Sequence, residues 1–158
     1  MFDTVLIAGL GLMGGSMAKT IKARTLSRVL GWNRTRATAE QALADGSIDA
    51  IATEALYKEA DLVIIGLYPQ ATVDWLLENM SKMKKGCVIV DMVGVKQFMV
   101  DHLEQAALDA GVHYVGGHPM AGREFSGLDF ALSTLFDGAS MIFVPTKSST
   151  ERVLEQLE

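Results

Sequence analysis

Cysteine, proline and long apolar runs are all scarce in this sequence of 158 residues. The single cysteine, Cys87, excludes an internal disulfide and fits a reducing compartment, so we expect a cytoplasmic protein. No apolar run approaches the roughly 18 residues of a membrane span, and we expect no membrane contact. The apolar N-terminal stretch follows residues 1–3, which lack the Lys or Arg of a signal peptide, so it is interpreted as a strand.

Positive charge is also scarce. The chain has 14 Lys and Arg residues against 19 Asp and Glu residues, for a formal net charge of −5. Without a basic cluster, nucleic acid is not expected as a partner. A hydrophobic content of 49% and a charged content of 21% are typical of a globular protein, and the length suits one ordinary domain with a real core.

What the sequence does contain is a glycine-rich turn between an expected strand and an expected helix. Thr4–Ala8 is a continuous apolar run, typical of a strand buried on both faces. Helical spacing follows in three apolar residues: Met13, Met17 and Ile21. The turn itself consists of spaced glycines and two apolar residues: Gly9, Gly11, Leu12, Met13 and Gly14. We assign these five residues to a cofactor site.

Each glycine of this G-x-G-x-x-G pattern has its own mechanical reason. Gly9 allows the tight turn, Gly11 lets a pyrophosphate approach the backbone, and Gly14 lets the helix pack closely on the strand. The helix then directs its free N–H groups and its positive dipole end at the pyrophosphate. The pattern therefore predicts a dinucleotide-binding site.

Strands and helices alternate along the rest of the chain. Further strands are expected at 29–32, 48–52, 61–67, 87–90, 112–115 and 141–144. The segments between several of them show apolar residues at helical spacing, with stops near Gly46 and Gly111. This alternation predicts an α/β fold of the Rossmann type, in which a doubly wound, mostly parallel sheet carries helices on both faces.

Ligands of such folds bind at the carboxyl ends of the strands, near the switch in strand order. Leu67, Tyr68 and Pro69 follow one strand end, and we assign them to the cofactor site. The dinucleotide-binding domain is expected to cover residues 1–147. Ser148 and Glu151 form a capping-box pattern, so residues 148–158 are interpreted as the start of a helix leading to a missing C-terminal helical domain.

The choice of cofactor depends on the end of the second strand. In NAD-binding folds an acidic residue about 20 positions after the turn holds the ribose 2′-hydroxyl. Here Asn33 stands at that place, followed by Arg34 and Thr35. An amide, a guanidinium and a hydroxyl can donate to a 2′-phosphate, which a carboxylate would repel. The sequence favours NADP over NAD, although the arginine could also be a solvated charge at a helix start.

A second glycine-rich segment, at 115–127, follows the carboxyl end of a strand. Its His118 is a candidate proton acceptor, because an imidazole titrates near neutral pH. His102 lies in an expected helix and His113 inside an expected strand, so both are interpreted as structural. We assign no metal site.

The chain resembles the prephenate (and arogenate) dehydrogenases of tyrosine biosynthesis. Three segments carry the resemblance: GLGLMGGS at Gly9–Ser16, the D-x-x-x-V-K pattern at Asp91–Lys96, and GGHPMAGREFSG at Gly116–Gly127. It covers essentially the whole chain but only the nucleotide-binding half of the family's architecture. Members continue into a helical domain that dimerises and completes the substrate site. The resemblance therefore implies a homodimer through that domain, and weak or no turnover by this domain alone.

The resemblance also implies a reaction, the oxidative decarboxylation of prephenate or arogenate with NAD or NADP. In the family, the histidine matching His118 polarises the substrate hydroxyl, and the residue matching Glu124 helps to organise the site entrance. Two positions depart from the family. Gly94, which we place in the cofactor site, stands where many members have a serine that supports the histidine. Arg123 replaces a small polar residue and is either a ligand for a substrate carboxylate or an exposed arginine.

Two other functions stay open at this point. One is a different oxidoreductase of the 3-hydroxy-acid dehydrogenase type, which shares the glycine-rich turn and the N-R-T strand end but uses a lysine from a later helical domain. The other is a dinucleotide sensor without enzymatic activity. The sequence also does not distinguish prephenate from arogenate as the substrate.

Overall fold

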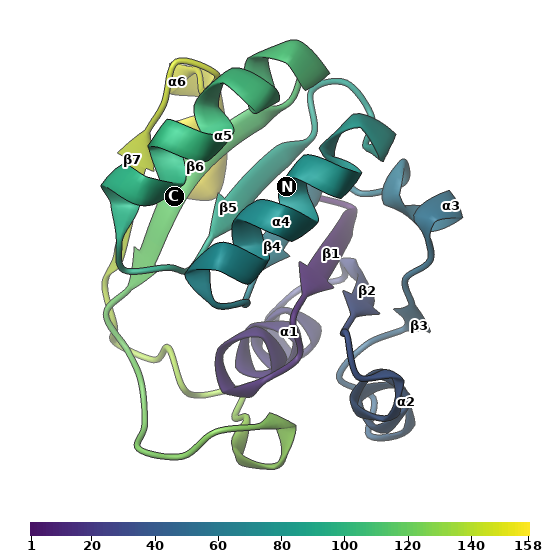
Figure 1. The fold of residues 1–158 in the computed structure, drawn as a ribbon. Coiled ribbons are helices and arrows are strands. Elements are labelled where there is room, and N and C mark those ends of the chain that lie inside the picture. The colour runs from purple at the N-terminus through teal and green to yellow at the C-terminus, as the bar shows by residue number, and fades with distance from the viewer.

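A seven-stranded sheet lies between two layers of helices in the computed structural model, which describes residues 1–158 (Figure 1). In sheet order the strands are β3 (Ala50–Ile51), β2 (Arg28–Trp32), β1 (Thr4–Ala8), β4 (Leu62–Ile65), β5 (Val88–Asp91), β6 (His113–Pro119) and β7 (Met141–Pro145). All neighbours pair in parallel except β6 and β7, which are antiparallel. The predicted Rossmann-type, mostly parallel sheet is confirmed.

The strand order reverses beside β1. The chain runs from β1 outward to β2 and β3, and then returns to place β4 on the other side of β1. The connections that follow β1 and β4 thus run toward opposite edges of the sheet. This divergence opens a crevice at the carboxyl ends of these two strands.

Helices cover both faces of the sheet. They are α1 (Leu12–Arg24), α2 (Arg36–Ala44), α3 (Glu54–Tyr57), α4 (Pro69–Asn79), α5 (Lys96–Ala110) and α6 (Glu151–Leu157), with short 3₁₀ turns η1 (Met80–Lys82) and η2 (Leu128–Phe130). Because side chains alternate along a strand, Val5 and Ile7 join the core under α1 and α2, whereas Leu6 and Ala8 join the core under α4 and α5. Figure 1 shows α4 and α5 across one face. None of these helices has the length and hydropathy needed to cross a membrane.

The prediction for the end of β6 was wrong. The strand was expected to end at Val115, but it continues to Pro119 because β7 pairs with it, placing Gly117 opposite Phe143 and His118 opposite Ile142. This antiparallel partner comes from more than 20 residues later in the chain, so no local pattern around His118 indicates it. His118 therefore lies on a hydrogen-bonded strand and not in a loop.

The capping-box prediction was also wrong. Thr150, not Ser148, is the N-cap of α6, and its hydroxyl accepts a hydrogen bond from the Val153 amide. The Ser148 hydroxyl instead accepts from the Tyr114 amide at 2.8 Å, so a tertiary contact with β6 takes the place of the local one. Val153 is buried in the sheet core, which docks α6 on the domain. The further domain after α6 stays a prediction.

A buried polar network ties β5, α5 and β6 together beneath the carboxyl end of the sheet. Asp91 is fully buried, and its carboxylate accepts from the Lys96 ammonium, from the Tyr114 hydroxyl at 2.6 Å and from the Val93 amide at 2.7 Å. Lys96 also donates to the Gly117 carbonyl oxygen at 2.5 Å. Burial lowers the pKa of Lys96, and the Asp91 carboxylate opposes this shift. For Tyr114, burial, the charge of Asp91 and the hydrogen bond to it all raise the pKa.

We expect Tyr114→Phe to lower the free energy of unfolding by about 1–3 kcal/mol, because it leaves one oxygen of a buried carboxylate without a donor. Urea denaturation of this chain measures the change. Tyr68→Phe is the matched control, since Tyr68 is 86% exposed and its loss of a hydroxyl should cost less than about 0.5 kcal/mol. Equal stability of the two variants would contradict a structural role for the Asp91 network.

Candidate functional site

The glycine-rich turn joins β1 to α1 through backbone contacts that leave no room for side chains. A Cβ atom at Gly14 would lie 1.7 Å from the Gly9 carbonyl oxygen, and a Cβ atom at Gly9 would lie 2.7 Å from the Gly66 carbonyl oxygen. Gly9 also has a φ of 93°, in the left-handed region that favours glycine. These glycines bring the start of α1 against the ends of β1 and β4.

Gly11, in contrast, faces open space. No atom lies within 4 Å of the position that its Cβ would take. It is the N-cap of α1, where no side chain caps the helix and the first turn contains no acidic residue. The first N–H groups of a helix have no partner inside the helix, and the helix dipole is positive at this end. The surroundings of Gly11 thus fit a pyrophosphate group.

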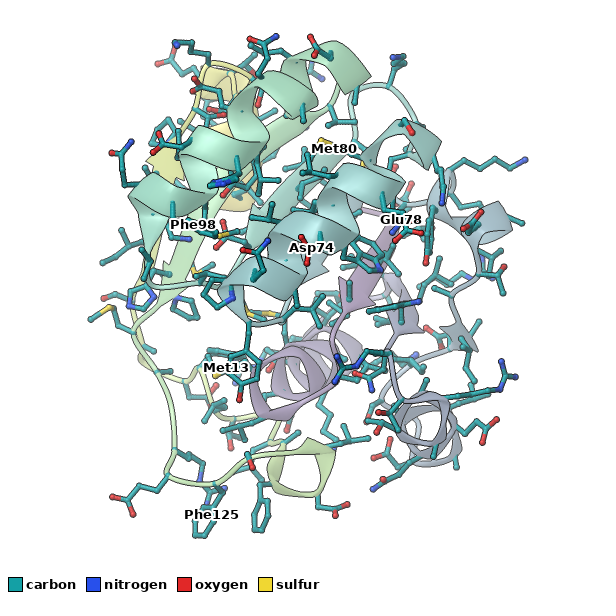
Figure 2. The ribbon with its side chains drawn as sticks, viewed as in Figure 1. Met13, Asp74, Glu78, Met80, Phe98 and Phe125 are labelled. Atoms are coloured by element: carbon teal, nitrogen blue, oxygen red, sulfur yellow. The ribbon has the colours of Figure 1, made fainter.

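Two clefts meet at this turn. The first, which we call the apolar cleft, has a volume of about 440 Å³ and no charged residue in its lining. The sequence-predicted cofactor residues in its lining are Gly11, Leu12, Met13, Leu67, Tyr68, Pro69 and Gly94. Phe125, Ser126 and Gly127 also line it, from the loop after β6. Figure 2 labels Met13 on α1 and Phe125 on that loop.

The second, which we call the charged cleft, has a volume of about 530 Å³. One side comes from the end of β2, with the predicted residues Asn33, Arg34 and Thr35, and the other from α4. Both clefts share Gly11, Gly66, Leu67 and Tyr68 in their linings, so they are continuous around the glycine-rich turn. A ligand with two separate ring systems joined by a pyrophosphate matches this arrangement.

Sequence reasoning missed the α4 side of the charged cleft. Its four residues are Ala71, Asp74, Trp75 and Glu78, which repeat at the i, i+3, i+4, i+7 spacing of one helix face. The ring centroids of Trp75 and Trp32 are 5.5 Å apart. Trp75 is buried, so the half-buried Trp32 is the indole with more surface to offer a planar base. The helical spacing and the strand end were both visible in the sequence, but not that the two face each other across one cleft.

The three residues at the end of β2 have different surroundings. Asn33 accepts from the Leu10 amide at 2.9 Å and donates to the Thr35 carbonyl oxygen at 3.1 Å, so its side chain braces the glycine-rich turn. Arg34 is exposed and has no carboxylate partner, whereas Arg36 pairs with Glu40 at 2.9 Å on α2. Arg34 is thus the guanidinium of this segment that is free to meet an anion.

His118 lies behind the apolar cleft, next to Gly94, which is part of the cleft lining while His118 is not. Its ring is half-buried, and a Cβ atom at Gly94 would be 3.2 Å from its Cε1 atom. The Nδ1 atom of His118 is buried without a hydrogen-bond partner. The absent side chain at Gly94 therefore leaves the imidazole next to the cleft without a group to fix its tautomer.

Arg123 and Glu124 belong to the exposed loop that follows β6. The guanidinium carbon of Arg123 lies 5.3 Å from the ring centroid of Phe125, which stacks on Phe130 at 4.7 Å between centroids. No hydrogen bond or ion pair joins Arg123 or Glu124 to the imidazole. The loop places both at the rim beside Phe125, and the roles assigned to them stay predictions.

The other histidines and the cysteine have structural surroundings. The Nδ1 atom of His102 lies 2.7 Å from the Phe98 carbonyl oxygen within α5, and the Nδ1 atom of His113 lies 2.6 Å from the Ser148 carbonyl oxygen. Burial raises the pKa of Cys87 to about 12, so its thiol stays protonated and unreactive at neutral pH.

A glycine-rich turn at the switch point of a doubly wound sheet, an uncapped helix N-terminus and two continuous clefts define a dinucleotide-binding domain of the Rossmann type. The family model for the prephenate dehydrogenase nucleotide-binding domain matches residues 17–158. The chain belongs to this family.

Individual relatives agree with the family match. The chain is 38% identical over 162 residues to prephenate dehydrogenase of Bacillus subtilis (strain 168), covering 100% of this chain and 43% of that protein. The chain thus spans less than half the length of this curated relative.

Solved structures show the same fold. A. aeolicus prephenate dehydrogenase in complex with hydroxyphenyl propionate and NAD+ superposes with a TM-score of 0.89 at 27% identity, over 99% of this chain and 55% of that one. Synechocystis arogenate dehydrogenase gives a TM-score of 0.86 at 24% identity, over 98% of this chain and 54% of that one.

Two glycine variants separate binding from folding at the turn. We expect Gly11→Ala to keep the thermal midpoint but to weaken dinucleotide binding at least about tenfold, because the methyl group would occupy the pyrophosphate's approach. Gly14→Ala should instead cost about 3 kcal/mol or more of stability, since its methyl group meets a backbone oxygen. Thermal denaturation and calorimetry with NAD and NADP measure both. A Gly11→Ala chain with unchanged affinity would place the pyrophosphate elsewhere.

Proposed function

We propose that this chain is the nucleotide-binding half of an NAD(P)-dependent dehydrogenase that converts prephenate to 4-hydroxyphenylpyruvate, or arogenate to tyrosine, with release of CO₂. The observation that carries the proposal is the position of His118 beside Gly94, which lines the cleft that the glycine-rich turn forms. Membership of the prephenate dehydrogenase family supports the reaction class.

The residues around the glycine-rich turn would hold the cofactor. The N–H groups at the start of α1 bind the pyrophosphate, the charged cleft takes the adenosine end, and the apolar cleft takes the nicotinamide end beside Leu67, Tyr68, Pro69 and Gly94. A nicotinamide bound there supplies the two-electron acceptor that the oxidation requires. The absence of charged residues from the apolar cleft keeps that end of the site poorly hydrated.

His118 handles the proton of the reaction. As ring C4 gives up its hydride to the nicotinamide and the ring carboxylate leaves as CO₂, the ring becomes aromatic. His118 would polarise the C4 hydroxyl, taking its proton as the hydride leaves and returning it to the phenol oxygen of the product. The chain otherwise needs only to orient the substrate toward the apolar cleft, because aromatisation supplies driving force. Glu124 and Arg123 are proposed for the rim, Arg123 as a ligand for a substrate carboxylate.

NADP is the cofactor that we propose for this site. The support is Arg34, an exposed guanidinium at the edge of the charged cleft that has no carboxylate partner. Such a group can bind a ribose 2′-phosphate by two parallel hydrogen bonds. The A. aeolicus structure contains NAD+, which supports the dinucleotide class and leaves NAD as the alternative.

Removal of the Arg34 guanidinium tests this preference. We expect calorimetry on this chain to show tighter binding of NADP than of NAD, and Arg34→Ala to shrink the difference by about 1–3 kcal/mol, the scale of a charge-assisted hydrogen bond. Arg36→Ala is the control, because Arg36 is engaged by Glu40 and does not line the cleft. Equal affinities of the unmutated chain for the two nucleotides would exclude the NADP assignment.

We further propose a second, helical domain that follows α6, completes the substrate site and forms a homodimer in the cytoplasm. The greater length of the relatives supports it, since this chain covers 43% and 44% of the two curated ones. NADP reduction measured with prephenate and with arogenate, in a protein that includes this domain, tests the function. Failure with both substrates would favour another 3-hydroxy-acid dehydrogenase-type enzyme or a non-catalytic nucleotide-binding domain.

The same assay tests His118. His118→Asn keeps a hydrogen-bonding group of similar reach but cannot accept a proton, so kcat should fall by about 10²–10⁴ while NADP affinity stays nearly unchanged. A variant with full kcat would assign the proton acceptor to another group.

A further inference from the structure

The charged cleft contains two carboxylates that the proposed cofactor site leaves unexplained. Asp74 and Glu78 line it from α4, opposite Arg34 at the end of β2. Figure 2 shows both side chains on α4, where they lie one helical turn apart. The cleft that would hold the adenosine ribose is therefore bounded by one guanidinium on one side and by two carboxylates on the other.

Neither carboxylate is neutralised within the protein. Asp74 accepts one hydrogen bond, from the neutral Gln70 amide at 2.8 Å, and no Lys, Arg or His pairs with it. Glu78 has no ion-pair partner, whereas Glu54 nearby is paired with Lys82 at 2.8 Å. Both carboxylate side chains are exposed. Their field acts on whatever occupies the cleft.

This field distinguishes the two nucleotides. NAD and NADP share the pyrophosphate, so repulsion of that group cancels when their affinities are compared. They differ at the ribose 2′ position, which is a neutral hydroxyl in NAD and a phosphate with a charge of about −1.5 to −2 in NADP. Negative charge opposite Arg34 therefore weakens NADP binding selectively, and the effect should fall with ionic strength.

We propose that Asp74 and Glu78 are specificity-determining residues. Their charges select against the 2′-phosphate and oppose the attraction of Arg34, and this balance sets the ratio of NADP to NAD affinity. This inference rests on the proposed dinucleotide site. It adds that the α4 side of that site, as well as the β2 side, determines the selectivity between NAD and NADP. Both side chains are exposed on one helix face, so the cofactor preference can be altered there without touching the glycine-rich turn or the core.

The test is calorimetry on this chain with Asp74→Asn, Glu78→Gln and the double variant, using NAD and NADP in 50 mM and 500 mM salt. We expect the double variant to bind NADP about threefold to tenfold more tightly at low salt, with NAD affinity changed less than about twofold. The single variants should show part of the effect. At high salt the gain should largely disappear, because the charges are exposed.

A matched control separates position from net charge. Asp109→Asn with Glu155→Gln removes the same two charges from α5 and α6, away from the cleft, and Asp109 accepts from Gln105 at 2.8 Å as Asp74 does from Gln70. The control should leave the ratio unchanged. An unchanged ratio in the cleft variant, or an equal change in the control, would overturn the inference.

The two proposals fail separately. If the unmutated chain preferred NAD, the NADP assignment would fall, but the ratio should still rise in the cleft variant. If the chain bound neither nucleotide, both the dinucleotide site and the role of these carboxylates would be overturned.

Discussion

The contact between the backbones of Gly9 and Gly14 is the constraint on which the rest of this structure depends. It places the first turn of α1 directly against the end of β1, at a distance that no side chain at Gly14 allows. Because β1 lies between β2 and β4, the same contact fixes where the two halves of the sheet diverge. Both clefts open from this point, so the turn sets the location of the whole candidate site.

A second constraint acts on the backbone beside His118. Lys96, at the start of α5, holds both Asp91 at the end of β5 and the carbonyl oxygen of Gly117 on β6. This buried ion pair fixes the backbone next to His118, whose own imidazole has no partner at Nδ1. The strand is thus held firmly, while the His118 side chain has no hydrogen-bond partner at Nδ1. The D-x-x-x-V-K pattern and the histidine segment, far apart in sequence, form one unit.

The parts of the fold that depend on local pattern could be read from the sequence. The apolar run at Thr4–Ala8, the glycine spacing and the helix after Pro69 all match the structure, because strand burial, turns and helix faces leave periodic marks in neighbouring residues. The parts that depend on distant partners could not. Pairing with β7 extended β6 through His118, and a contact with Tyr114 took Ser148 away from its expected capping role. The α4 side of the charged cleft is recognisable as part of a site only when the end of β2 is seen to lie opposite it.

The composition of the two clefts explains why this domain can bind a cofactor yet needs help with the proposed substrates. Prephenate and arogenate carry carboxylates, and the apolar cleft offers them no Lys, Arg or His in its lining. Arg123 lies at the rim, over Phe125, as a cation of the loop after β6. A substrate carboxylate buried beside the nicotinamide would need a positively charged partner there, because an unpaired carboxylate in a poorly hydrated cleft is costly in free energy. An apolar lining that suits a nicotinamide is thus a poor place for a substrate carboxylate, which is why the proposed role of Arg123 is at the rim and why the proposed second domain is needed to complete the site.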